Sequence, residues 1–383
     1  VTSNVGSIAN SGEINSLTIQ SGSNIANGIT NNLNIDTLTI NANANLGSGI
    51  TNNSNIANLN VKSNVTYAGN GSITNALDID GAQTQFTIDS NGTLTLTNTA
   101  GANSVKTITN EGTIIGNLIN TLTTDWIGGT LEGNFTNNSG ATLESLSNGT
   151  ITGNLTNGNN GIINTLNTSK VGGSIANDGN LVNVIVDSNK TLTGNGSITN
   201  SLVVEKNNSG NGFTLTIGNN GTGNLNFKAT NGTINNAGTI NGNITNVSGS
   251  TIADFTNSGN MVGNITNSAG STITIFENIG TITGNIDNTG VITDFDNQGI
   301  INGTLTNNGN IGDFTNSGSI KEFNNQKFIA FYENNGIIGK FNNTGTIYGV
   351  SNSKVITGDL GNNIAALKNT GTISGNVELV GQR

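Results

Sequence analysis

The chain has 383 residues, including 55 glycines but no proline, cysteine or histidine, and its formal net charge is −10. Without histidine and cysteine, it cannot form a His-assisted catalytic triad or a His/Cys metal site. The basic residues are few and scattered, with one arginine at Arg383, so nucleic-acid binding is not expected. No apolar run approaches the length of a membrane-spanning helix, about 18 residues or more. The first residues do not resemble a signal peptide.

The first 75 residues repeat with a constant spacing. Leu17, Leu38 and Leu59 each begin a short apolar segment, and they are 21 residues apart. A Gly-Ile-Thr-Asn-Asn motif begins at Gly28 and again at Gly49, with the same spacing. Short-period self-similarity of this kind is typical of repeat proteins, so these spacings predict a structural unit of roughly 20 residues.

Two less regular zones interrupt the repeats, near residues 77–110 and 201–231. Each follows one copy of a longer duplication, in which residues 56–75 align with residues 181–200 and 12 of 20 positions are identical. We expect longer strands or excursions from the repeat in these zones. Because the chain has no proline and no charge run that would mark a linker, we predict one continuous domain over residues 1–383.

The only tryptophan, Trp126, lies in an Asp-Trp-Ile-Gly-Gly segment. A side chain of this size is enriched at contact surfaces, so Trp126 is a candidate binding residue. A buried or half-buried structural role is the alternative.

Residues 234–352 are the most regular part of the chain, a tandem repeat of nine to eleven residues. Asparagine recurs once in each unit, and glycine usually follows two or three residues later. A first apolar column contains Ile252, Val262, Ile273, Ile282, Ile292, Ile301, Ile311, Ile320, Ile329, Ile338 and Ile347. A second column, two residues before each asparagine, contains Ile244, Phe255, Ile265, Phe276, Ile286, Phe295, Leu305, Phe314, Phe323, Tyr332, Phe341 and Val350.

These units predict strands rather than helices. Glycine and asparagine are poor in helices, whereas the abundant threonine, isoleucine and valine suit a pleated strand. Between residues 244 and 314 the second column alternates Ile or Leu with Phe, and the unit length alternates with it. Two units therefore make one coil of about 18–21 residues, in which Phe stacks on Phe and Ile on Ile. The predicted fold is all-β, a parallel β-helix or β-solenoid.

Each column has a physical role in such a coil. Isoleucine and phenylalanine point into a narrow core, while threonine occupies outward positions. Asparagine and glycine lie at the corners, because both tolerate turn conformations that other residues avoid. Stacked asparagines are expected to hydrogen-bond one another from coil to coil.

The segment from Lys327 to Glu333 breaks this pattern. Lys327 replaces a column glycine, and Phe331 occupies a position that holds Asp or Lys in other units. An outward Phe331 beside Phe328 would provide a contact surface, so both are candidate binding residues. Local packing under a loop is the alternative.

Carboxylates are the remaining candidates for chemistry. Asp254, Asp294 and Asp313 each precede a column phenylalanine, and Asp294 and Asp313 are expected one coil apart, a separation of about 5 Å that suits a retaining glycosidase. The alternative is a solvated outward face. β-Helical polysaccharide lyases are the enzyme class to weigh, but they need a basic residue and clustered acids in a groove. We therefore predict no enzyme activity, no catalytic residues, no metal site and no cofactor.

The repeats resemble a known group of proteins. Asn-Thr-Gly-Val-Ile at residues 288–292 and Asn-Ala-Gly-Thr-Ile-Asn-Gly-Asn-Ile at residues 236–244 are similar to the passenger domains of Gram-negative autotransporters (type V secretion), of the adhesin or vacuolating-cytotoxin-like repeat type. The resemblance implies a right-handed parallel β-helix at the outer surface of the cell, with a role in adhesion, aggregation or toxicity. The family's membrane domain and pore-forming segment are not recognised in this chain.

These observations together predict an exported, surface-displayed passenger that mediates adhesion or self-association and contributes to virulence. Its expected partners are glycans or proteins of host or bacterial surfaces, or a second copy of the chain. A structural stalk, filament or surface-layer subunit is one alternative. A secreted toxin or a glycan-active β-helix enzyme is another.

Overall fold

The computed structural model describes residues 1–69, 71–80, 84–88, 93–96, 106–110, 112–121, 123–146, 149–205 and 223–379, together with 207, 209, 211, 213–218 and 221. Its contacts divide the chain into two compact units, unit 1 (Val1–Leu181) and unit 2 (Val182–Arg383). Strand β24 (Asn180–Val186) contains the point of division. The continuous domain over residues 1–383 stays a prediction.

Unit 1 is built from rows of parallel strands, each strand pairing with the next in its row. The first row contains β1 (Ile8–Asn10), β4 (Ile29–Asn31), β7 (Ile50–Asn52), β9 (Val65–Ala68), β11 (Gln85–Ile88), β14 (Thr113–Ile115), β17 (Thr130–Glu132) and β20 (Thr150–Ile151). The second contains β2 (Ile14–Ile19), β5 (Ile35–Ile40), β8 (Asn55–Val61), β10 (Ser72–Ile79), β13 (Lys106–Asn110), β16 (Thr123–Ile127), β19 (Thr142–Leu143) and β22 (Ile162–Asn167). β3 (Asn24–Ile25) and β6 (Asn45–Leu46) form a separate two-stranded sheet. A third row contains β12 (Thr93–Leu96), β15 (Asn117–Asn120), β18 (Phe135–Asn137), β21 (Leu155–Asn157) and β23 (Ile175–Asn177). One 3₁₀ turn, η1, covers Thr168–Lys170.

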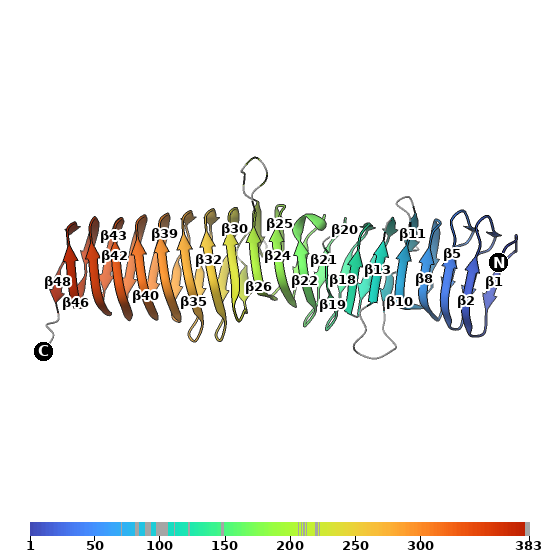
Figure 1. Ribbon diagram of the computed structural model, residues 1–383, viewed down its shortest axis with the longest axis horizontal. Coiled ribbons are helices and arrows are strands. Elements are labelled where there is room, and N and C mark those ends of the chain that lie inside the picture. The colour runs from blue at the N-terminus through green and yellow to red at the C-terminus, as the bar shows by residue number, and fades with distance from the viewer. Residues whose placement is uncertain are drawn as a thin grey trace. The chain divides into compact units, whose positions relative to one another are not determined.

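Unit 2 is also built from rows of stacked parallel strands (Figure 1). Its main row contains β26 (Ser197–Val204), β29 (Gly232–Asn236), β32 (Thr251–Asn257), β35 (Thr272–Asn278), β38 (Val291–Asn297), β40 (Asn310–Asn316), β42 (Phe328–Asn334), β44 (Thr346–Asn352), β46 (Gly361–Asn369) and β48 (Val377–Leu379). Two shorter rows contain β25 (Lys190–Thr193), β27 (Thr214–Ile217), β30 (Thr239–Asn241), β33 (Asn260–Met261) and β36 (Thr281–Ile282), and β28 (Asn224–Phe227), β31 (Asn243–Asn246), β34 (Ile265–Asn267) and β37 (Ile286–Asn288). Both rows join at β39 (Ile300–Asn307), which is followed by β41 (Ser319–Asn325), β43 (Ile337–Asn343), β45 (Val355–Asp359) and β47 (Thr372–Ile373).

The predicted β-solenoid is therefore confirmed in each unit. The register repeats the spacing expected from the sequence, since Leu17 pairs with Leu38 and Leu38 with Leu59. In unit 2 the coil shortens along the chain, from 21 residues between Asn257 and Asn278 to 18 between Asn316 and Asn334. This shortening accompanies the merging of two strand rows into one at β39.

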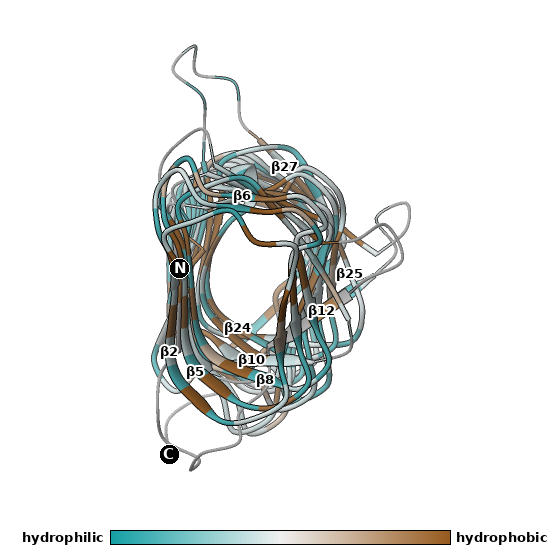
Figure 2. Ribbon diagram, turned by 90° about the vertical axis from the view of Figure 1, so that its right-hand side faces the viewer, coloured by the Kyte–Doolittle hydropathy of each residue, from teal (hydrophilic) through white to brown (hydrophobic). Residues whose placement is uncertain are grey.

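The core of unit 2 consists of the predicted stacks. Phe255, Phe276, Phe295 and Phe314 pair in register from coil to coil, with ring centroids 4.6–4.8 Å apart. Ile244, Ile265, Ile286 and Leu305 form the corresponding aliphatic stack. All of these side chains are buried. Burying each of them stabilises the fold by about 1.5–3 kcal/mol. In unit 1, apolar and polar segments alternate along β2, β5 and β8 (Figure 2).

Buried asparagines form ladders of hydrogen bonds, as predicted. In each step Nδ2 of one asparagine donates to Oδ1 of the next asparagine in the ladder. One ladder in unit 2 runs through the buried Asn236, Asn257, Asn278, Asn297, Asn316, Asn334 and Asn352 and ends at the exposed Asn369, and a second runs through Asn246, Asn267, Asn288, Asn307, Asn325 and Asn343. Unit 1 contains two further ladders. The first runs through Asn10, Asn31 and Asn52, whose Nδ2 donates to the hydroxyl of Tyr67, and the second runs through Asn120, Asn137, Asn157 and Asn177. These bonds matter because an unpaired buried amide would cost about 1–3 kcal/mol.

One member of the predicted first apolar column is wrong. Met261, not Val262, pairs with Ile240 on one side and Ile282 on the other. Met261 is buried, whereas Val262 is 46 % exposed. The spacing from the preceding asparagine explains the difference, because Met261 follows Asn257 by four residues, as Ile282 follows Asn278.

The column glycines allow neighbouring coils to approach closely. A Cβ atom on Gly299 would lie 2.0 Å from the carbonyl oxygen of Gly280, so no other residue fits there without displacing a coil. The less regular zones are described only in part. Residues 81–83, 89–92 and 97–105 of the first zone, and 206, 208, 210, 212, 219, 220 and 222 of the second, lie outside the described residues.

Candidate functional site

The outward residues of β42 place two phenylalanines on the surface of unit 2. Ile329 and Tyr332 point inward, while Ala330 and Phe331, which are adjacent in sequence, both point outward. Two consecutive outward residues mean that the strand bends here, since side chains alternate along a straight strand. Phe328 lies on one side of this bend and Phe331 on the other. The outward orientation of Phe331 agrees with its prediction, since Phe331 pairs with Asp313 of the preceding coil.

A third ring comes from the next coil. Tyr348 of β44 packs edge-on against Phe328, with ring centroids 5.1 Å apart and planes at 89°. Phe331 lies over Gly349, where a Cβ atom would be 2.9 Å from Cδ2 of the ring. We call Phe328, Phe331 and Tyr348 the aromatic corner. Phe331 is 42 % exposed and Tyr348 59 % exposed, while Phe328 is half-buried.

Small and polar residues surround the aromatic corner. Phe331 shares its outward column with Asp313, Gly349 and Ala366, so the residues that follow it in the column are small. Phe328 pairs with Asn310 in the preceding coil and with Thr346 in the following coil. The rings are therefore bordered by small residues and by the hydrogen-bonding side chains of Asn310, Asp313 and Thr346, which we call the polar rim.

Tyr332 lies directly beneath the aromatic corner, in the core. Its side chain is fully buried, and its hydroxyl finds no hydrogen-bond partner among the described residues. Burial raises the pKa of this hydroxyl above its ordinary value, so it stays neutral. The ring stacks with Phe341 and is tilted against Phe314.

Replacing Tyr332 by phenylalanine is expected to stabilise unit 2 by about 1–3 kcal/mol, because the change removes a buried polar group that lacks a partner. Urea unfolding of the purified chain measures the difference. Tyr348→Phe, which removes an exposed hydroxyl, is the matched control and should change stability by less than about 0.5 kcal/mol. A loss of stability in Tyr332→Phe would show that the hydroxyl is hydrogen-bonded in solution.

Trp126 lies in unit 1 and is buried, with 1 % of its surface exposed. Its Nε1 donates to the carbonyl oxygen of Gly128 at 2.7 Å, and its ring packs against Phe135. It pairs with Ile108 in the apolar stack. This position favours the structural role over the binding role. Trp126 belongs to unit 1, whereas Phe328 and Phe331 belong to unit 2.

The candidate carboxylates lie one coil apart, as expected, with Asp294 and Asp313 in register. Partial burial raises the pKa of Asp294 above its ordinary value, and the neighbouring Asp313 and Asp296 carboxylates add to the rise. Asp254 is separated from Asp294 by Ile275 in the same column. In the part of the chain that the structure describes, no group of three or more acidic side chains is arranged to hold a metal ion.

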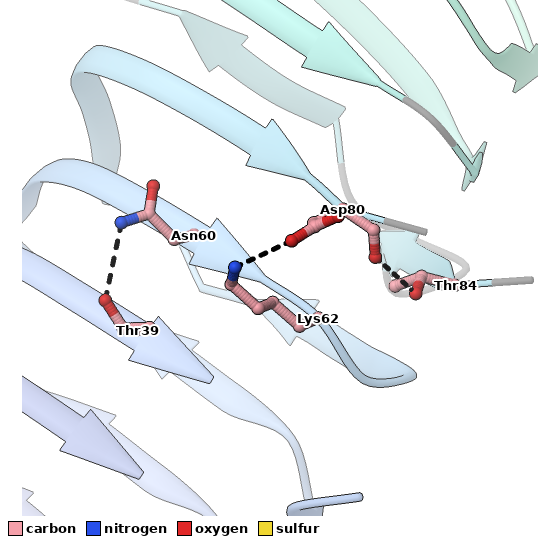
Figure 3. A network of polar contacts seen from close by, with 5 residues as sticks. All are labelled: Thr39, Asn60, Lys62, Asp80 and Thr84. Atoms are coloured by element: carbon pink, nitrogen blue, oxygen red, sulfur yellow. Dashed lines mark hydrogen bonds and ion pairs between the residues drawn. The ribbon is translucent and has the colours of Figure 1, made fainter. Parts of the chain in front are cut away.

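A polar network lies on the surface of unit 1 (Figure 3). Lys62 Nζ donates to Asp80 Oδ2 at 2.6 Å, and Thr84 Oγ1 donates to the backbone oxygen of Asp80 at 2.8 Å. Asn60 Nδ2 donates to Thr39 Oγ1 at 3.3 Å. An exposed ion pair of this kind contributes about 0–1 kcal/mol, so the network is a minor link between coils.

Comparison with known proteins adds no family to this description. No protein-family model, no curated protein sequence and no solved structure matches the chain. Within the described residues, no helix has the length and apolar character needed to span a membrane.

Sequence reasoning found Phe328 and Phe331 but missed Tyr348. The available signal was the coil length, since the coil at this point has 18 residues and Tyr348 follows Ala330 by 18. Ala330 and Tyr348 are therefore neighbours in adjacent coils, and Tyr348 belongs to the same break in the pattern.

Proposed function

We propose that this chain is a recognition module of the cell exterior, which mediates adhesion through the surface of its solenoid. The proposal includes export of the chain and its display as a passenger of the autotransporter type, as the resemblance of its repeats implies. In this role the stacked coils act as a rigid support, and binding takes place on outward side chains.

The aromatic corner is the observation that carries the proposal. Most outward positions of unit 2 hold threonine, asparagine, serine or acidic residues, which water solvates well. The two exposed aromatic side chains among the described residues, Phe331 and Tyr348, lie on consecutive coils. Exposing such rings to water is unfavourable, and clustered exposed rings mark interaction sites.

An adhesion assay tests the proposed function. Beads coated with the purified chain should bind to epithelial cells or to bacteria more than beads coated with albumin. The double variant Phe331→Ala/Tyr348→Ala should bind less, whereas Ile275→Ala, which removes an exposed aliphatic side chain from the same column as Phe331, should bind normally. Equal retention of chain-coated and albumin-coated beads on every cell type would contradict adhesion.

Self-association is a second candidate function. It is favoured by exposed apolar side chains along the strand row of β39, β41, β43 and β45 in unit 2. Ile300, Ser319, Ile337 and Val355 are successive partners in register, and the three apolar members are exposed. Sedimentation velocity should detect oligomers whose fraction rises with concentration and falls in Ile337→Lys. A monomer at all concentrations would exclude this function.

A further inference from the structure

We propose that the aromatic corner binds an uncharged pyranose sugar, with one ring stacked on a face of the sugar. This inference deepens the proposed adhesion function and rests on it, because it names the chemical class of the ligand. Three observations carry it: the exposure of the rings, their mutual orientation and the residues that surround them.

The first observation is that the rings of Phe331 and Tyr348 are partly accessible, with 42 % and 59 % of their surfaces exposed. One side of the Phe331 ring packs over Gly349, and the next residue of the column is the small Ala366, so no large side chain of these coils covers the exposed part. Ala330, between the two phenylalanines in sequence, is equally small. A flat ligand therefore reaches Phe331 without a rearrangement of the backbone.

The second observation is the position of the rings on the two sides of the bend. The planes of Phe328 and Tyr348 are perpendicular, at 89°, and Phe331 lies on the opposite side of the bend in β42. A pyranose in the chair form presents C–H groups on its faces and hydroxyl groups around its edge. Its C–H groups would pack against Phe331 or Tyr348 while its edge stays free for hydrogen bonds.

The third observation is the polar rim. Asn310, Thr346 and the hydroxyl of Tyr348 supply both donors and acceptors, and Asp313 supplies an acceptor beside Phe331. A sugar has many hydroxyl groups that need such partners, because each one that is buried without a hydrogen bond weakens binding. The aromatic corner therefore combines apolar ring surface with hydrogen-bonding groups beside it, and a sugar likewise combines C–H faces with hydroxyl groups.

Other ligand classes fit less well. A stable protein interface buries about 800 Å² on each partner, more than three partly exposed rings on small residues provide. Nucleic acids and anionic membranes need a basic surface, whereas the chain carries a net charge of −10 and Asp313 and Glu333 adjoin the corner. Lys327 is the one basic residue next to Phe328 in sequence, and it is not part of a cationic cluster. An acidic sugar therefore gains no advantage over a neutral one.

Nuclear magnetic resonance tests the inference on the purified chain. Lactose, cellobiose and N,N′-diacetylchitobiose, whose rings have exposed C–H faces, are titrated separately at millimolar concentration. We expect the aromatic signals of Phe331 and Tyr348 to shift with at least one of them, and sialyllactose to bind no more tightly than lactose. Phe331→Ala should weaken binding about tenfold or more, the change that corresponds to loss of one good ring contact.

Matched variants separate stacking from general hydrophobicity. Phe331→Leu keeps an apolar side chain but removes the ring, so it should lose affinity as Phe331→Ala does. Ile275→Ala, in the same outward column and with an exposure of 45 % close to that of Phe331, should bind the sugar normally. Both positions are at the surface, and circular dichroism checks that each of the three variants folds.

The outcomes distinguish this inference from the adhesion function. If no sugar shifts the ring signals but coated beads still adhere to cells, the glycan inference is overturned and adhesion stands. If neither sugar binding nor adhesion is found, both are overturned. If a sugar binds but Phe331→Leu binds it equally well, or if sialyllactose binds more tightly than lactose, the stacked neutral site is overturned.

Discussion

Replacing Asn297 by aspartate is expected to destabilise unit 2 by about 3–5 kcal/mol at neutral pH, the cost of an uncompensated buried charge. Asn297 is fully buried, and its Oδ1 accepts a hydrogen bond from Asn278 at 2.7 Å. Its Nδ2 faces acceptors only, namely Oδ1 of Asn316 at 2.8 Å and the carbonyl oxygens of Gly299 and Ser319 at 3.4 Å. An ionised carboxylate would place a negative oxygen against all three.

The loss should depend on pH in a defined direction. A protonated carboxyl group has one donor and one acceptor, so it reproduces the hydrogen bonds of the asparagine amide in the ladder. The folded state therefore raises the pKa of the new carboxyl group above its unfolded value of about 3.9, by roughly 2–4 units for the cost given above. Below the unfolded pKa the charge penalty is absent. It grows as the pH rises through the interval between the two pKa values, and it is complete above the folded pKa.

Urea unfolding at pH 4 and pH 7, with the unchanged chain measured at each pH, checks this expectation. Asn297→Ala also breaks the ladder but cannot ionise, so its loss should be the same at both pH values. Asn308→Asp introduces the same charge at an exposed position next to the second ladder and should change stability by less than about 0.5 kcal/mol. An equal loss for Asn297→Asp at both pH values would mean that water enters the ladder and solvates the charge.

The features that the sequence predicted are those that recur in every coil. A core position must fit the coils before and after it, so the constraint is repeated and becomes visible as a column. The alternation of Ile286 and Phe295 predicted two separate stacks, and the structure contains both. The asparagine ladder was predictable for the same reason, because a buried amide in one coil is best satisfied by the same group in the next.

Features that occur once were harder to predict. Met261 was missed because its neighbour Val262 has the side-chain type typical of the column, whereas the spacing from Asn257 decides which residue points inward. Tyr348 was missed because its relation to Phe328 depends on an exact coil length of 18 residues, which had varied from 21 to 18 along unit 2. Outward positions carry no packing constraint from coil to coil, so their pattern shows where a site lies only when its residues depart from the usual type.

Replacing Phe295 by alanine is expected to cost about 3–5 kcal/mol, the range for removal of a buried phenylalanine. Phe295 is fully buried between Phe276 and Phe314, at centroid distances of 4.6 and 4.8 Å and interplanar angles of 7° and 20°. Alanine leaves a cavity that neither neighbour can fill, because both are held in register by their own strands, β35 and β40. The two flanking rings also lose their stacking partner, which adds to the loss of buried area.

The location of the damage is as informative as its size. In a solenoid each coil contacts only its neighbours, so the loss should be concentrated near the replaced residue. Hydrogen exchange should show faster exchange of the amides of β35, β38 and β40 in Phe295→Ala, with β46 little changed. Ile275→Ala removes an exposed side chain from β35 and serves as the control, with an expected change below about 0.5 kcal/mol. If Phe295→Ala raised exchange equally in β38 and β46, unit 2 would unfold as a single cooperative block, and the stacked rings would stabilise the whole unit rather than their own coils.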